Sequence, residues 1–527
     1  MLVIWPLVVV LFSSVSDGIG LSFAGFEKFF TSRFYYSTLT NSILLTVCVT
    51  LAALVVSFPL AYIMTMFRIR GSRTVQMLIL ASMMSPPFIG AYSWILLLGN
   101  NGLITRGIEN VLGFKPPSIY GFSGIVLVLT LQLVPLIFTY LMGAWRSIDV
   151  SLLEASESMG VTGWRRVFQV IAPLLWPTVL AGSLLVFVRA FADFGTPMLI
   201  GQGFRTVPVL IFNSFVGEVG TDKSFAASVS VIVIVVTLAV FFVQKYLVGR
   251  QRFSMTALRT IKARQLPRGQ SALAHIYVYG FLTLALAPLV VVVVSSFRNT
   301  LYGEFVDGYS FDNYLNSQQE ILRYVGNTFG IGLTALVISV IIAVLVAYLT
   351  VRRKGALSGT IDTFTMVPYV VPGLVVGIAL VIAFNQRPFL LTGTFTIMVI
   401  ALTIRRLPYS VRSTTALMYQ ISPSIEEAAI SLGASKTRTL LQIIVPALAP
   451  GILAGAVLSW VTIITELSTT LFLYNNSTQT LSLGIYVQVI RAQLGTAAAL
   501  ATILLVLTML SLLLLMRLPG GNRDFKM

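Results

Sequence analysis

The segment EEAAISLGASKTRTLLQIIVPALAP at residues 426–450 is half polar, although most of the chain around it is apolar. A close copy, EASESMGVTGWRRVFQVIAPLLWP, lies at residues 154–177. The two copies align without gaps, so that Gly160 matches Gly433 at an offset of 273 positions. A match of this length between separate segments indicates an internal duplication. The fold must therefore present two equivalent copies of this segment.

The composition is that of a membrane protein. Of the 527 residues, 57% are hydrophobic and only 10% are charged, whereas a soluble protein carries about 25% charged residues. Apolar runs long enough to cross a bilayer as helices recur along the whole chain. We therefore expect an all-α polytopic membrane protein with about twelve transmembrane helices. The expected spans are residues 1–15, 41–66, 74–99, 120–143, 178–201, 225–248, 273–296, 327–350, 362–385, 394–417, 451–474 and 497–517.

The start of the chain is expected to be a shortish first membrane helix. Residues 1–15, MLVIWPLVVVLFSSV, lack the basic first region and the small-residue cleavage site of a signal peptide.

The basic residues predict the orientation of the spans. The net charge is +17, and Lys and Arg cluster in loops at residues 67–73, 249–269 and 351–355. Because basic residues concentrate on the cytoplasmic side of membrane proteins, these loops, both termini and both repeated segments are expected in the cytoplasm. Topology thus explains the positive charge, which argues against nucleic acid as a partner.

The duplication extends over most of the chain. Upstream of the repeated segment, Asn41 matches Asn327 at an offset of 286. We expect a first transmembrane half at residues 1–248, a basic cytoplasmic linker at 249–272 and a second transmembrane half at 273–527. With about six spans each, an even number, both halves enter the membrane in the same direction. They are then related by a pseudo-twofold axis along the membrane normal, unlike inverted repeats.

Each repeated segment has the pattern of a helix, a sharp turn and a second helix. A serine three residues before the glutamate, Ser151 or Ser424, predicts a capping box at the start of the first helix. Gly160 and Gly433 are expected to end that helix, because glycine readily adopts the left-handed conformation. Ser435 and Thr162 predict the start of the second helix in their respective copies. Two such elements on one face of the membrane indicate docking elements for a cytoplasmic protein.

These segments resemble the EAA loops of permeases of type I ABC importers. The second copy has Glu-Ala-Ala, three further residues and Gly, and then leads to Ile-Val-Pro. The first copy is looser, with Ser156 in place of the second alanine and Val161 where alanine is common. The two fused halves, with FADFGTPMLIG at 191–201 and ITELSTTLFLY at 464–474, resemble ferric-iron-type permeases.

The resemblance implies a permease subunit of an ATP-binding-cassette importer in a bacterial inner membrane. It implies that each EAA loop couples to one of two copies of a cytoplasmic ATPase, and that an extracytoplasmic binding protein delivers the substrate. The ATPase-coupling residues it implies are Glu154, Ala155, Gly160, Glu427, Ala428 and Gly433.

This chain is not expected to be an enzyme. ATP and Mg²⁺ are expected on the partner ATPase, and no catalytic residue, bound cofactor or metal site is expected here. The fragment GASKT at 433–437 is no phosphate-binding loop, because Ala428 stands where that motif requires its first glycine. The single cysteine, Cys48, and the single histidine, His275, are expected to have no chemical role.

Charged residues at membrane depth are the candidates for the translocation path or gate, because they are costly there. They are Arg189, Asp193, Arg405, Arg406 and Glu466. Arg189 and Asp193 are four apart, so they are expected to pair on one helix face, and Asp193 matches Glu466 in the repeat. Two interpretations remain open: ion pairs that lock a gate, or groups that touch the substrate. Carboxylates suit a hard cation such as ferric ion, and arginines suit a phosphate or carboxylate.

The resemblance favours ferric iron as the substrate, and a phosphonate, a sugar phosphate, thiamine or a polyamine remain alternatives. A secondary transporter driven by an ion gradient is the alternative from another class. Prolines within the expected spans, Pro86, Pro87 and Pro372, predict kinks that act as hinges or as static packing features.

Overall fold

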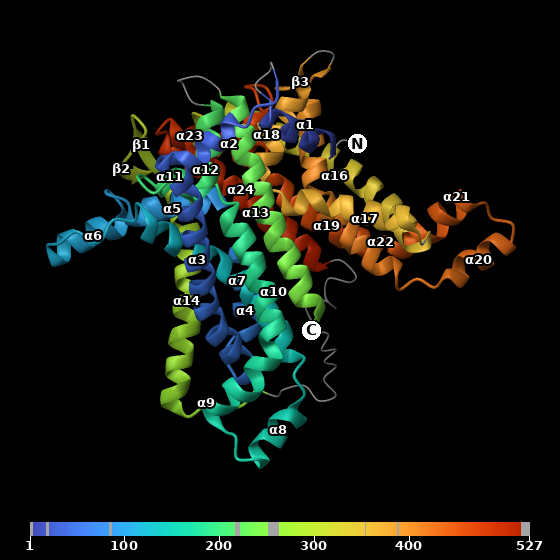
Figure 1. Cartoon of the computed structure of the whole chain (residues 1–527). Coiled ribbons are helices and arrows are strands. Elements are labelled where there is room, and N and C mark those ends of the chain that lie inside the picture. Colours follow the sequence, from blue (N-terminus) through green and yellow to red (C-terminus); the bar gives the residue numbers. More distant parts are fainter. Residues whose placement is uncertain are drawn as a thin grey trace. The chain divides into compact units, whose positions relative to one another are not determined.

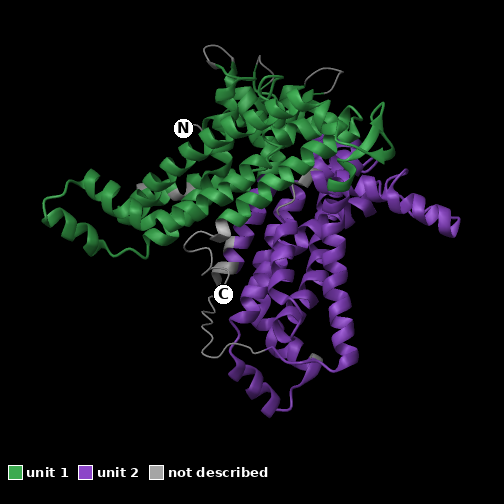
Figure 2. Cartoon of the chain, turned by 180° about the vertical axis from the view of Figure 1, so that it is seen from behind, with its two compact units in different colours: residues 1–29, 211–234, 293–526 green, residues 30–210, 235–292, 527 purple. Residues whose placement is uncertain are grey.

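The computed structural model describes residues 4–16, 20–83, 87–216, 222–250, 263–353, 355–386 and 389–517. Over these residues the chain is almost wholly helical (Figure 1). It forms two compact units, coloured separately in Figure 2. Unit 1 comprises Met1–Phe29, Ile211–Ile234 and Val293–Lys526, and unit 2 comprises chiefly Phe30–Leu210 and Val235–Val292. Residues 251–262 of the expected linker lie outside the described residues.

Unit 2 is a helical bundle built around α3, α7 and α10. Its core includes the fully buried Val49, Ile137 and Trp145. A buried polar contact also joins two of the helices, since Ser57 Oγ lies 3.1 Å from Val134 O. The elements are α3 (Arg33–Met66), α4 (Ser72–Met83), α5 (Pro87–Leu98), α6 (Leu103–Leu112), α7 (Phe122–Arg146), α8 (Val150–Ser158), α9 (Gly163–Arg166), the π-helical turn η1 (Val167–Ile171), α10 (Ala172–Phe191) and α11 (Gly195–Ile200).

Unit 1 is a second bundle, built around α16, α19 and α22. Its elements are α1 (Ile4–Ser14), α2 (Ala24–Thr31), α15 (Asp312–Leu315), α16 (Gln318–Arg352), α17 (Ala356–Val370), α18 (Gly373–Phe384), α19 (Phe395–Met418), α20 (Pro423–Ser431), α21 (Lys436–Thr439), the π-helical turn η2 (Leu440–Ile444), α22 (Val445–Ile464), the 3₁₀ turn η3 (Thr470–Phe472), α23 (Leu481–Ile490) and α24 (Leu494–Arg517).

Four of the described helices carry the chain from one unit to the other. They are α2, which crosses between Phe29 and Phe30, α12 (Val207–Val216), α13 (Lys223–Arg250) and α14 (Arg268–Ser295). As a result α14 packs in unit 2, where Tyr277 Oη donates a hydrogen bond to Val56 O at 2.9 Å. In unit 1, Val10 of α1 packs with Ala379 of α18. The two units differ from the two halves expected from the repeat, residues 1–248 and 273–527, which are defined by sequence and not by packing. The boundaries of those halves stay a prediction.

The expectation of helices alone misses two small hairpins. In unit 1, β1 (Arg298–Leu301) pairs with β2 (Glu304–Tyr309), and β3 (Asn385–Gln386) pairs with β4 (Phe389–Leu390), both antiparallel. The first hairpin turns at Tyr302 and Gly303, both of which have positive φ.

Eight of the described helices are long and apolar enough to cross a membrane, and a sharply bent pair, α17 with α18, makes nine. The protein is therefore a helical polytopic membrane protein, with fewer clear spans than the twelve expected. Among the described residues of the first expected span lies the 11-residue α1, which is about 16 Å long. The span expected at 74–99 contains α4 and α5, and residues 84–86 between them, including Pro86, lie outside the described residues. The span expected at 394–417 is helical, but α19 carries arginines.

The duplication is repeated in the helices themselves. Four consecutive elements, α8, α9, η1 and α10, begin and end 273 positions before α20, α21, η2 and α22. Upstream, α5 lies 286 positions before α18. Since π-helical turns make up well under 1% of residues in proteins, their occurrence at matched positions is a specific mark of the repeat.

Candidate functional site

Each repeated segment forms a helix, a glycine turn and a second helix, which we call an elbow. The first elbow is residues 150–166 and the second is residues 423–439. Gly160 and Gly433 end α8 and α20 in the left-handed conformation, with φ of 76° and 88°. The prediction that these glycines end the helices is confirmed.

Both glycine turns have the hydrogen bonds of a Schellman motif. In the first, Val161 N lies 2.9 Å from Ser156 O, and Gly160 N lies 2.9 Å from Glu157 O. The corresponding distances in the second are 3.1 Å and 2.9 Å, from Ala434 N to Ala429 O and from Gly433 N to Ile430 O. A substituent at either glycine would meet open space, so the backbone angle is what requires glycine there.

The capping boxes expected at Ser151 and Ser424 are wrong. The caps lie two residues earlier: Asp149 Oδ1 accepts a hydrogen bond from Ser151 N at 2.9 Å, and Ser422 Oγ accepts one from Ser424 N at 3.3 Å. The expected cap of the second helix is confirmed at Ser435, whose Oγ accepts a hydrogen bond from Arg438 N at 3.3 Å. The cap expected at Thr162 stays a prediction.

The expected coupling residues lie on the open side of each elbow. Glu154 and Ala155 are exposed on α8, and Glu427 and Ala428 are exposed on α20. The next residues along each helix, Ser156 and Ala429, are buried. The exposed residues are therefore accessible to another molecule.

Two exposed apolar pairs in the elbows were missed from the sequence. Met159 is 73% exposed and its repeat counterpart Leu432 is 89% exposed, each directly before the left-handed glycine. Leu152 and Ile425, at the other end of α8 and α20, form a second matched exposed pair. An apolar residue at the same two positions of both copies was the available signal. Each elbow thus presents two apolar side chains outward.

Both elbows lie at the arginine-rich ends of their bundles. In unit 2, α8 and α9 lie at the end opposite α5 and α11 (Figure 1). There Arg146 Nη2 donates to Gln76 Oε1 at 3.0 Å, close in sequence to the basic loop at 67–73. In unit 1, α20 and α21 lie beyond the ends of α16 and α22, next to Arg352 (Figures 1 and 2).

Three of the five expected membrane charges gather in unit 1. Arg406 of α19 forms an ion pair with Glu466, and both side chains are nearly buried. Glu466 Oε1 also accepts hydrogen bonds from Thr469 N at 3.0 Å and from Thr469 Oγ1 at 2.9 Å. A Cβ at Gly373 would lie 3.1 Å from the same oxygen, so this glycine leaves room for the carboxylate at the start of α18.

Arg405 supports the bend between α17 and α18. Pro372 has no N–H to donate, and Val371 before it is extended, with φ of −72° and ψ of 129°. The carbonyl of Pro368, four residues before Pro372, therefore loses its helical donor. Arg405 Nη1 donates to the oxygens of both Pro368 and Val371. The guanidinium thus replaces backbone hydrogen bonds lost at a break of 108°.

The other two expected charges lie in unit 2, and their expected pairing on one helix face is wrong. The helix α10 ends at Phe191, so Asp193 lies past it. There Asp193 Oδ1 accepts a hydrogen bond from Thr196 N at 2.9 Å. The equivalent bond in the other repeat runs from Thr469 N to Glu466 Oε1. The repeat counterparts of Arg405 and Arg406 are Gln132 and Leu133. The two halves therefore carry different charges in equivalent places.

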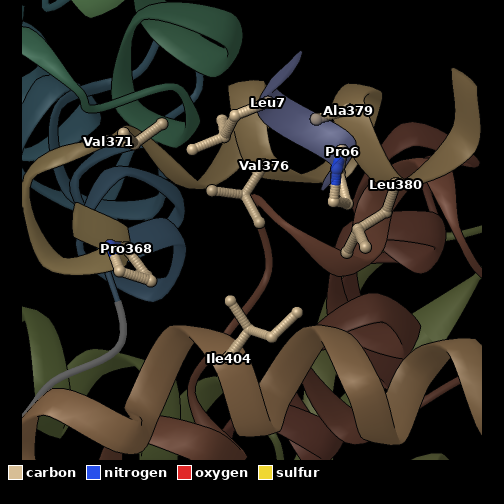
Figure 3. Close-up of a pocket in the computed structure, with 8 residues that line it drawn as sticks. All are labelled: Pro6, Leu7, Pro368, Val371, Val376, Ala379, Leu380 and Ile404. Atoms are coloured by element: carbon tan, nitrogen blue, oxygen red, sulfur yellow. The ribbon is translucent and has the colours of Figure 1, made fainter. Parts of the chain in front are cut away.

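An apolar pocket lies beside the bend in unit 1 (Figure 3). It has room for about one water molecule. Its lining is apolar throughout, from Pro6, Leu7, Pro368, Val371, Val376, Ala379, Leu380 and Ile404. Within the described part of the chain, no three acidic, histidine or cysteine side chains come together as a metal site would require.

The chain is similar to several transport proteins. It is 26% identical to the ferric transport system permease protein FbpB of Actinobacillus pleuropneumoniae, over 99% of this chain and 77% of that protein. It is also 26% identical to the putative ferric transport system permease protein FbpB 1 of Haemophilus influenzae, over 90% of this chain and 76% of that protein. A putative 2-aminoethylphosphonate transport system permease protein, PhnU of Salmonella paratyphi A, is 24% identical over 47% of this chain and 86% of its own length.

The family match covers both sequence halves. Residues 53–253 and 339–518 match the model of the binding-protein-dependent transport system inner membrane component, and each match contains one elbow. These residues are well over half of the chain, which therefore belongs to the family of inner membrane components of binding-protein-dependent transport systems.

Proposed function

We propose that this inner-membrane permease imports ferric iron and that each of its elbows docks on one copy of a cytoplasmic ABC ATPase. The family makes the chain the multi-pass permease component of an ABC transporter, not the catalytic one, and implies ATPase and binding-protein partners. The proposal adds the cargo, the docking sites and the number of ATPase copies.

The observation that carries the docking proposal is the matched geometry of the elbows. Both have a left-handed glycine, a Schellman turn and exposed apolar residues at the same positions. Both lie next to arginine-rich loops, which favours a position on the cytoplasmic side of the membrane. We place both chain termini on the same side. Two matched docking elements suit two copies of one partner. A secondary transporter driven by an ion gradient has no need for them.

The docking would transmit the state of the ATPase to the membrane helices. ATP and Mg²⁺ would be held by the partner. Closure of the ATPase dimer would draw the elbows together and favour one of two arrangements of the bundle, which requires that the nucleotide-bound partner binds one arrangement better. Glu154, Gly160, Glu427 and Gly433 are the residues we assign to this coupling.

The cargo is proposed from the relatives together with the acidic residues of the two units. Two of the relatives described above are named as ferric transport permeases and match nearly the whole chain. Asp193 lies past the end of α10, where it accepts a hydrogen bond from Thr196 N, and a carboxylate suits a hard cation. Glu466 is already neutralised by Arg406, which favours a structural role there. The relative PhnU makes a phosphonate the second candidate cargo.

Reconstitution tests the whole proposal. The chain is co-expressed with its ATPase and placed in liposomes with the binding protein, loaded either with ⁵⁵Fe(III) or with a labelled phosphonate. We expect a stable complex with two ATPase copies and ATP-dependent iron uptake. Phosphonate uptake in place of iron would replace the cargo, and uptake driven by an ion gradient without ATP would overturn the transporter class.

A glycine variant tests the elbow assignment. Gly433→Glu should abolish uptake while the binding protein keeps its affinity for the substrate. Gly113→Glu is the matched control, because Gly113 is also left-handed, with φ of 71°, and also faces open space, but lies at the end of α6. Normal transport by Gly433→Glu would contradict the assignment.

A further inference from the structure

The second elbow is fixed to the end of a membrane-spanning helix by polar contacts. Tyr348 Oη of α16 donates a hydrogen bond to Glu426 Oε1 of α20. Arg352 Nε lies 3.1 Å from Glu426 Oε2, and Arg352 Nη2 lies 3.0 Å from Ile421 O, just before α20. The side chains of Arg352 and Glu426 are only 12% and 15% exposed. These three side chains form what we call the clamp.

The first elbow has no such clamp at the equivalent positions. By the offsets of the repeat, Glu426 corresponds to Leu153, Arg352 to Met66 and Tyr348 to Tyr62. The tyrosine is therefore shared, but the charged pair is absent, and the ring of Tyr62 packs against Trp145 with centroids 5.3 Å apart. Leu153 is buried in the apolar core of unit 2, together with Trp145, and Met66 packs against the same core. The first elbow is thus attached to its bundle at these positions by apolar side chains.

An ion pair in the first elbow does not replace the clamp. Arg166 Nη1 lies 3.4 Å from Glu157 Oε2 and joins α9 to α8, within the elbow itself. Glu157 is 54% exposed, so water and salt weaken the pair. Its repeat counterparts, Ile430 and Thr439, carry no charge.

The two kinds of attachment resist movement differently. Hydrogen bonds between charged groups are directional and about twice as strong as neutral ones, and a mostly buried pair is screened little by salt. Apolar packing is non-directional. The clamp therefore fixes the direction of α20 relative to α16, whereas apolar packing lets α8 slide or rotate against its neighbours at lower cost.

The clamped helix reaches the opposite end of unit 1. The 35 residues of α16 span about 52 Å. Near its other end, Asn327 Nδ2 donates to Ser477 O at 2.8 Å and to Gln479 O at 2.9 Å, and Thr328 Oγ1 accepts from Leu481 N at 2.8 Å. One continuous helix thus connects the second elbow with the loop before α23.

We propose that Tyr348, Arg352 and Glu426 are positioning residues that make the second elbow the more rigidly coupled of the two. The clamp passes a displacement of α20 directly into α16 and through it to the loop at residues 477–480. At the positions equivalent to the charged pair, the first elbow is held by apolar packing and tolerates more movement. This inference rests on the proposed docking of an ATPase on each elbow.

Spin-label mobility tests the clamp itself. In a Cys48→Ser background, a nitroxide is placed at Ser431→Cys on α20 or at its exposed repeat counterpart Ser158→Cys on α8. The full chain is studied in nanodiscs. We expect Glu426→Gln to increase mobility at position 431 and to leave position 158 unchanged. An unchanged spectrum at position 431 would overturn the clamp.

Two further variants separate the clamp from general damage to the fold. The exchanged pair, Glu426→Arg with Arg352→Glu, should restore low mobility at position 431, because it keeps the opposite charges. Arg353→Gln removes the neighbouring exposed arginine and should leave the spectrum as in the native chain. Failure of the exchanged pair to restore order, with the protein folded, would count against a charge-dependent contact.

Coupling is measured in the same variants as iron transported per ATP hydrolysed, with ⁵⁵Fe(III) on the binding protein as the probe. We expect Glu426→Gln to lower this ratio about tenfold, as for loss of one hydrogen bond to a charged group. Leu153→Met, at the matched position, should change it less than about twofold. If the native chain shows no ATP-coupled uptake, the proposed function fails while the mobility result stands. Equal coupling in native chain and Glu426→Gln would overturn the clamp alone.

Discussion

Asp193 and Glu466 occupy the same position in the two repeats and accept the same hydrogen bond. Each carboxylate lies past the end of its long helix and receives the backbone N–H three residues on, at 2.9 Å from Thr196 and 3.0 Å from Thr469. Glu466 also forms an ion pair with Arg406. In the repeat that contains Asp193, the position matching Arg406 holds the uncharged Leu133. The same backbone feature therefore carries different electrostatics in the two halves.

Neutralising the two carboxylates should have unequal effects on stability. Glu466→Gln leaves Arg406 without its counter-charge at membrane depth and should destabilise the protein by about 3 kcal/mol. Asp193→Asn keeps an oxygen that accepts the Thr196 N–H and should cost less than about 1 kcal/mol. Thermal unfolding in detergent measures both, with Glu466→Asp as a control that keeps the charge. Equal losses would contradict the distinction.

The bend between α17 and α18 should depend on Arg405. Arg405→Gln removes the guanidinium that donates to the oxygens of Pro368 and Val371, and should destabilise the protein by about 2 kcal/mol. Pro372→Ala restores a backbone N–H, so Arg405→Gln should cost about 1 kcal/mol less in that background. The double-mutant cycle is measured by thermal unfolding. Strict additivity of the two changes would rule out the link between them.

The exposed apolar residues of the elbows should matter for binding and not for folding. Met159→Ser or Leu432→Ser should leave the unfolding free energy within about 0.5 kcal/mol of the native value, because both side chains are largely exposed. Each should weaken binding of the ATPase about tenfold, as for an apolar anchor in an interface. Affinity is measured on nanodiscs, with Leu112→Ser of α6, also exposed, as the control. Native affinity in both elbow variants would exclude these residues from the interface.

The stability of unit 1 should respond to acid through Asp222. Partial burial opposes ionisation of this carboxyl, but the hydrogen bond from Phe225 N–H and the neighbouring Lys28 outweigh it and hold the pKa of Asp222 below its usual value. Its contribution is therefore complete above the unfolded pKa of about 3.9 and is lost as the pH falls through the lower folded pKa.

The size of this effect should not exceed about 1 kcal/mol, because both side chains of the pair are 45% exposed. Melting temperatures are measured from neutral pH downwards in the native chain and in Asp222→Asn, which keeps an oxygen at the start of α13. The variant should lose the part of the acid dependence that lies below about pH 4. Parallel curves for the two proteins would contradict the assignment to Asp222.

The repeat and its helices were predictable because their signals are local. Gly160 and Gly433 end helices as predicted, since a left-handed residue favours glycine regardless of its surroundings. The caps were misplaced by two residues because Asp149 and Ser422 are as good at capping as the serines that follow them. Nothing in the local sequence distinguishes these candidates.

Long-range contacts could not be predicted in this way. The clamp joins Arg352 to Glu426, 74 positions away, and the role of Arg405 depends on a carbonyl that Pro372 leaves without a donor. The pairing expected for Arg189 and Asp193 was wrong because the helix ends between them. A charged residue in an apolar segment indicates that a partner exists, but only the packing of the helices shows which residue that partner is.

The transfer of helices between the two units has a consequence for biosynthesis. Unit 2 lacks α14 until the ribosome has made the residues up to Val292, and the segment Met1–Phe29 belongs with a unit whose last helix comes at the end of the chain. Neither bundle can therefore be completed from its own end of the polypeptide. The first helices to be synthesised can therefore pack fully only after their partners have been translated. A chain cut between α13 and α14 would yield two fragments, each of which needs the other to complete its fold.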